Sequence, residues 1–142
     1  MDQNELVTPK KTSPWVLLLR IGVVASLIAV LVEFVTAGQL ITYNMDALPV
    51  HYAGAFAVHG ALGVQVLGAV MVWLGSRQTR QGTPNPHFTI LLVSLGAFAV
   101  GFPQAALGTY GPLQAHVPLA MVLVGLIVWS AVLVFRRRYE TG

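Results

Sequence analysis

The chain has 142 residues, of which 56% are apolar and only 9% are charged, and it contains no cysteine. A soluble domain carries roughly 25% charged residues, so this composition indicates a membrane protein. The missing cysteines exclude disulfides, iron–sulfur clusters and Cys-ligated zinc. The net charge of +3 comes from short basic segments with no basic amphipathic stretch, so we expect no nucleic-acid partner.

Four apolar segments follow one another along the chain, each long enough to cross a lipid bilayer. Ser13 and Pro14 end a polar tail (1–13) and form a helix-start pair. The predicted spans are 15–41, 53–74, 87–107 and 114–135, in one domain over 14–136, followed by a second tail over 137–142. Polar residues rich in turn formers separate these spans. Pro103 is expected to kink or end the third of them.

The basic residues predict how the chain is oriented in the membrane. All eight can be placed on one side, and they are Lys10, Lys11, Arg20, Arg77, Arg80, Arg136, Arg137 and Arg138. Short loops rich in Lys and Arg remain cytoplasmic. We therefore expect an integral protein of a bacterial or archaeal cell membrane, with both termini in the cytoplasm.

The two halves of the chain resemble each other. His59 precedes Trp73 by 14 residues in the second span, and His116 precedes Trp129 by 13 residues in the fourth. This similarity predicts an all-α four-helix bundle built from two repeated helical hairpins. The two histidines would then occupy equivalent positions near the outer face.

His59 and His116 are the candidate ligands of a metal centre. Two imidazoles at one depth on two helices suit axial ligation of a single haem iron. Small residues around His59, including Gly63, leave room for a flat macrocycle. The alternative is that such residues only allow close helix packing, with each histidine hydrogen-bonded at a helix interface. We expect one haem b near the outer face.

Polar residues near these histidines are further candidates for the cofactor site. Glu33 is the only acid inside a span, and a buried ionisable group in a membrane is a functional candidate. It would be a hydrogen-bond partner of a histidine, a proton relay or a substrate contact, or else a protonated carboxyl bonded to another helix. Gln114 and Gln104 lie near His116 in the sequence and are candidates for orienting a ligand, or else for hydrogen bonding between helices.

The two remaining histidines carry less weight. His51 is expected in the outer loop over 42–52, as a solvated residue or a reserve ligand. His87 begins the third span at the inner side and has no histidine partner at that level. A chain of two haems across the bilayer would need a second pair there, so a single haem is the prediction.

The run LLVSLGAFAVG at 91–101, then Gln114-Ala115-His116 and Leu119-Ala120-Met121, resembles a helix pair of the haem A synthase family. The resemblance implies a four-helix haem-binding half, or a related small four-span haem protein, with paired histidines near the outer side. His59 and His116 fall on those positions. Phe56 and Gly60 depart from the family's ExxHR arrangement, and the outer-loop cysteine pair is missing. Haem ligation is therefore carried over, and oxidation of the haem methyl group is not.

Three functions are consistent with these patterns. The first is a b-type cytochrome-like subunit of a larger respiratory or photosynthetic membrane complex, exchanging electrons with a partner protein or a quinone. The second is a cofactor-free structural or assembly subunit, packed in a larger complex or as a homo-oligomer. The third is a haem-modifying enzyme like haem A synthase.

Overall fold

The computed structural model of the chain describes residues 12–77 and 86–136. The elements are α1 (Pro14–Ile41), a short 3₁₀ helix η1 (Met45–Ala47), α2 (Leu48–Arg77), α3 (Pro86–Tyr110) and α4 (Leu113–Arg136). The predicted all-α four-helix architecture is confirmed. Pro14 starts α1 because its missing N–H needs no partner in a first turn.

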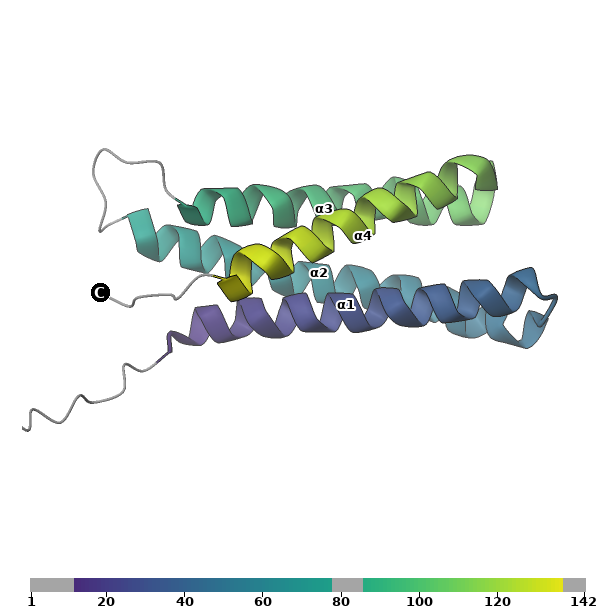
Figure 1. Ribbon diagram of the computed structural model, residues 1–142, viewed down its shortest axis with the longest axis horizontal. Coiled ribbons are helices and arrows are strands. Elements are labelled where there is room, and N and C mark those ends of the chain that lie inside the picture. The colour runs from purple at the N-terminus through teal and green to yellow at the C-terminus, as the bar shows by residue number, and fades with distance from the viewer. Residues whose placement is uncertain (1–11, 78–85, 137–142) are drawn as a thin grey trace, which may run out of the picture.

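The four long helices form a bundle in which sequential helices run in opposite directions, so the start of α1 and the end of α4 lie at one end (Figure 1). Each helix packs against two neighbours, in the pairs α1–α2, α2–α3, α3–α4 and α1–α4. In the described part of the chain, the diagonal pairs α1–α3 and α2–α4 make no such contact. Side chains of α2 and α4 therefore meet only across the bundle interior.

Each of the four helices is long and apolar enough to cross a membrane. The shortest, α4, has 24 residues. At about 1.5 Å per residue this gives about 36 Å, more than the roughly 30 Å of a bilayer's hydrocarbon core. Large apolar side chains also point outward, as Leu31 (64% exposed) and Phe56 (80% exposed) do. An apolar exterior of this kind is compatible with an integral membrane protein.

Two glycines bring α1 and α2 into backbone contact. A Cβ added to Gly22 would lie 2.5 Å from the backbone nitrogen of Gln65, and one added to Gly68 would lie 2.6 Å from that of Leu19. Small residues allow this approach, which replaces the missing hydrophobic driving force between helices in lipid. The hairpin α1–α2 is thus packed tightly in the half nearer the start of α1.

Two groups of buried apolar side chains fill the bundle. One contains Leu19, Val23, Ala69, Ile90, Leu91 and Val134, and the other contains Val30, Val58, Leu62, Ala97, Leu123 and Ile127. A polar contact lies within this core, where the Gln65 amide donates a 3.0 Å hydrogen bond to the Ser94 hydroxyl. The core therefore ties α2 to α3 by a polar bond as well as by apolar packing.

Some predicted boundaries were wrong. The second helix begins at Leu48 rather than residue 53, so His51 belongs to its first turn and not to a loop. Pro49 is the second residue of that helix, where proline is well tolerated. The third helix continues through Pro103 to Tyr110 instead of ending near residue 107, which membrane helices permit because neighbouring groups can satisfy the freed carbonyl.

Several residues used to predict orientation lie outside the described residues. These are Lys10, Lys11, Arg80, Arg137 and Arg138, with most of the two tails and of the loop between α2 and α3. Arg77 closes α2 and Arg136 closes α4. These two helix ends lie at the same end of the bundle as the start of α1 (Figure 1). We refer to this as the terminal end, and to the other, where η1 lies, as the loop end.

Candidate functional site

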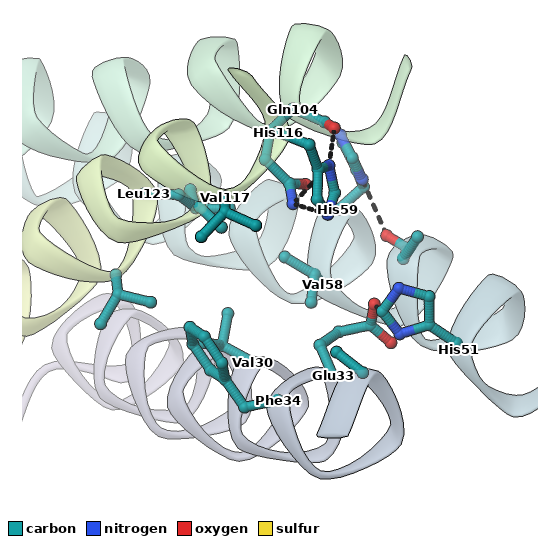
Figure 2. A pocket seen from close by; sticks show the side chains of 14 residues that line it. Val30, Glu33, Phe34, His51, Val58, His59, Gln104, His116, Val117 and Leu123 are labelled. Atoms are coloured by element: carbon teal, nitrogen blue, oxygen red, sulfur yellow. Dashed lines mark hydrogen bonds and ion pairs between the residues drawn. The ribbon is translucent and has the colours of Figure 1, made fainter. Parts of the chain in front are cut away.

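A cavity of about 110 Å³ lies in the half of the bundle nearer the loop end. Its lining comes from all four long helices (Figure 2): Val30, Glu33, Phe34, Ala37, His51, Ala55, Val58, His59, Gln104, His116, Val117, Ala120, Leu123 and Val124. Most of these side chains are apolar, and the polar ones include three histidines, one carboxyl and one amide. A largely apolar cavity with a few convergent polar groups is the usual form of a small-molecule site.

The cavity opens sideways between α1 and α4. Phe34 of α1 and Val117 of α4 both line it, yet they are 44% and 61% exposed on the bundle surface. In a membrane, this mouth faces the lipid chains. A lipophilic molecule could therefore enter from the bilayer.

His59 is oriented by a hydrogen bond within α2 and by packing of its ring against α3. Its Nδ1–H donates a 2.8 Å hydrogen bond to the backbone carbonyl of Ala55, one turn earlier in α2. The ring also packs on Phe102, with centroids 4.7 Å apart. Its Nε2 is buried and has no hydrogen-bond partner within the described residues. Because Nδ1 carries the proton, this Nε2 presents a lone pair.

Gly101 of α3 lies beside that nitrogen and allows the His59 ring to approach the α3 backbone closely. A Cβ at this position would lie 3.0 Å from Nε2 of His59. A buried nitrogen without a hydrogen-bond partner is energetically unfavourable, and such a group often marks a functional site. The lone pair of His59 Nε2 is thus unused within the described residues, and it is a group that can accept a hydrogen bond or bind a metal.

His116 is oriented in the same manner by a carbonyl of another helix. Its Nδ1–H donates a 2.7 Å hydrogen bond to the backbone carbonyl of Gln104 in α3. The Gln104 side-chain amide lies 3.3 Å from Nε2, which therefore accepts a long hydrogen bond. His116 has the same tautomer as His59, with the lone pair on Nε2.

The two histidines lie on the diagonal helices α2 and α4 and line the same cavity (Figure 2). With neighbouring helix axes about 8–10 Å apart, the diagonal of a four-helix square is about 11–14 Å. This is the widest span in the bundle, so it is where a ligand can lie between two side chains. The structure thus brings together the two residues that the sequence singled out.

His59 lies farther from the start of its helix than the predicted distance of about five residues. His59 lies 11 residues after the first residue of α2, whereas His116 lies three residues after that of α4. The hairpin α1–α2 projects farther at the loop end than α3–α4 does (Figure 1). The longer hairpin lets the two histidines line one cavity despite this offset.

Glu33 and His51 form a pair on the α1–α2 side of the cavity. The Nδ1 of His51 lies 3.2 Å from Oε2 of Glu33 and 2.9 Å from the Thr36 hydroxyl. Gly54 makes room for the carboxyl, because a Cβ there would collide with Oε1 of Glu33. Sequence reasoning selected Glu33 but missed its partner, since it placed His51 in a loop. The helix-start signal of Pro49 could have revealed it.

The other predicted site residues are not brought to the cavity. Gly63 is not among the lining residues, and a Cβ on it would lie 3.9 Å from the Phe98 ring. Gln114 is exposed in the first turn of α4, and Gln104 lines the cavity instead. His87 lies at the start of α3, at the terminal end.

Within residues 12–77 and 86–136, no cluster of three or more His, Asp or Glu side chains is placed to hold a metal ion by itself. The two imidazoles of His59 and His116 suit a bound molecule that needs two nitrogen atoms to coordinate it. Neither family models, nor curated proteins, nor solved structures gave a match to this chain.

Proposed function

We propose that the protein binds one haem b in the loop-end half of the bundle, where His59 and His116 would hold its iron. The observation that carries this proposal is that the two imidazole rings have the same tautomer and the same kind of hydrogen bond. Each gives its Nδ1–H to a backbone carbonyl and keeps a lone pair on Nε2, and both rings line one cavity. Metal-binding histidines are commonly fixed in this way by a hydrogen bond from the other ring nitrogen.

The cavity also suits the flat, apolar part of a haem. Val30, Val58 and Leu123 supply apolar walls, and Gly101 and Gly108 of α3 allow the two imidazoles to lie close to the α3 backbone. At about 110 Å³ the cavity is smaller than a typical ligand pocket of roughly 300–1,000 Å³. Binding must therefore widen it, and the α1–α4 side, where the mouth lies, is the side that can open.

When bound, a haem supplies reversible one-electron transfer. The chain holds it, excludes water with apolar side chains and fixes both ligands through carbonyls of Ala55 and Gln104. We infer from this a b-type cytochrome-like role in electron transfer, as a subunit of a larger respiratory or photosynthetic complex. Its partner would be a redox protein or a quinone.

The proposed orientation follows from the basic residues. We propose that the terminal end, with Arg20, Arg77 and Arg136, faces the cytoplasm, because positive charge is retained there. The haem then lies on the outer side of a bacterial or archaeal cell membrane.

The test is a reduced-minus-oxidised visible spectrum of the detergent-purified protein, with a pyridine haemochrome assay for the type and amount of haem. We expect a low-spin b-type spectrum at one haem per chain. His59→Ala and His116→Ala should each abolish or convert it, whereas His87→Ala, at the terminal end of α3, should leave it unchanged. A folded, colourless protein after haem supplementation would contradict the proposal and favour a cofactor-free structural or assembly subunit.

A further inference from the structure

The cavity contains a second polar group that haem ligation does not use, namely the pair Glu33–His51 with Thr36 beside it. The Thr36 hydroxyl lies 3.0 Å from the carbonyls of both Val32 and Glu33 and donates to them. Its oxygen therefore accepts the hydrogen bond from His51, whose Nδ1–H is shared between Thr36 and the Glu33 carboxyl. The proton of neutral His51 is thus fixed on Nδ1.

One oxygen of this carboxyl lacks a partner. Oε1 of Glu33 is buried and has no hydrogen-bond partner within the described residues, while Oε2 faces His51. A buried carboxylate oxygen without a donor is costly to desolvate. The pair therefore has a place for one more proton, on Oε1 of Glu33 or on the outer nitrogen of His51.

Few other charges face this pair. Among the residues that line the cavity, α2 and α4 contribute His59 and His116, and α3 contributes only the neutral Gln104. No Lys, Arg or Asp is among them. Because nearby charges interact strongly in an apolar interior, a change of one charge in the cavity must act on the pair.

We propose that Glu33 and His51 together form a proton-binding site that takes up one proton when the adjacent haem is reduced and releases it on oxidation. This inference rests on the proposed haem site. Reduction by one electron lowers the net charge of the cavity by one, and uptake of one proton by the pair restores that net charge. The two residues titrate as one unit, so the proton belongs to the pair and not to either residue alone.

The pair is not fully enclosed by the bundle, as a proton-binding site requires. The side chains of His51 and Glu33 are 22% and 19% exposed, and His51 is in the first turns of α2, at the loop end of the bundle. The proton would therefore come from the aqueous phase at the face where the haem lies. Electron transfer by this protein is then coupled to the proton concentration on that side.

The experiment is a redox titration of the haem-loaded, full-length protein from about pH 5 to about pH 9, a range around the ordinary titration of histidine. We expect the midpoint potential to fall with pH, by up to about 59 mV for each tenfold change in proton concentration. Glu33→Gln and His51→Asn should each flatten this dependence. Asp46→Asn, an exposed acid at the same end that does not line the cavity, should retain it.

The outcomes separate the two proposals. A haem-loaded wild-type protein whose potential does not vary with pH overturns the proton site and leaves the haem site intact, and a slope that persists in Glu33→Gln does the same. A protein that binds no haem overturns both. If the variants fold poorly, redox-induced infrared spectra of the wild-type protein labelled with ¹³C-glutamate decide the matter. A labelled carboxyl band must change with the oxidation state if Glu33 takes part, because haem propionates and ligand imidazoles carry no label.

Discussion

The His116 imidazole lies directly over Gly108 of α3. A Cβ added to Gly108 would stand 2.7 Å from Cε1 and 2.9 Å from Nδ1 of that ring. This close approach lets His116 reach the backbone carbonyl of Gln104, one turn earlier in α3. The orientation of the His116 ring on α4 thus depends on the absence of a side chain at Gly108 of α3.

Replacing Gly108 with alanine should displace the His116 ring and weaken haem binding without removing either ligand. We expect a lower haem content and a shifted or mixed-spin spectrum, measured by haem titration of the purified protein. Gly125→Ala in α4, where a Cβ would meet nothing within 4 Å, is the matched control and should bind haem normally. Equal haem affinity in both variants would argue against a role for Gly108 in orienting His116.

Gly22→Ala should destabilise the bundle by about 1–3 kcal/mol, the usual range for overpacking. The added methyl would meet the backbone of Gln65, which has no rotamer by which to move away. Gly38→Ala in the same helix, where the space is open, should be neutral or slightly stabilising because alanine favours helix. Unfolding in detergent, followed by circular dichroism, compares the two variants.

The hydrogen bond between Gln65 and Ser94 predicts a non-additive result. Ser94→Ala should lower the free energy of unfolding by about 1–2 kcal/mol, since it leaves the buried amide of Gln65 without its acceptor. The double variant Gln65→Leu/Ser94→Ala should recover much of this loss, because both polar groups are gone. If the loss of unfolding free energy in the double variant equals the sum of the losses in Gln65→Leu and Ser94→Ala, the hydrogen bond is not the source of the effect.

The chain contains no cysteine, so single cysteines can report its orientation. We expect Asn44→Cys and Thr109→Cys, both exposed near the loop end, to react with a membrane-impermeant maleimide on intact cells. Thr12→Cys, just before α1, should react only after the membrane is opened. The opposite pattern would invert the proposed topology and place the cavity on the cytoplasmic side.

The four spans could be predicted from the sequence because hydropathy and length alone decide whether a helix can cross a bilayer. The ends of the helices were harder, since Pro49 and Pro103 are each compatible with a boundary or a helix. Pro49 starts α2 early, and Pro103 does not end α3. One misplaced start concealed the contact of His51 with Glu33, because a residue expected in a loop was not considered as a partner within the bundle.

His59 and His116 could be selected from the sequence because imidazoles are rare in apolar segments. Their hydrogen bonds could not, since the partner of His116 is a backbone carbonyl of α3 and the identity of Gln104 does not determine it. Likewise, the role of Gly108 depends on how α3 and α4 pack. A glycine has the same appearance in the sequence whether it faces lipid or an imidazole.

The cavity draws its walls from α1 and α2 and also from α4, which is far from them in the sequence. During synthesis, Glu33, His51 and His59 are therefore made long before His116. A molecule that needs both sides of the cavity could be held only after α4 has packed against the other helices. Any ligand of the proposed site would then be loaded after α4 is in place, and a chain interrupted before α4 would not retain it.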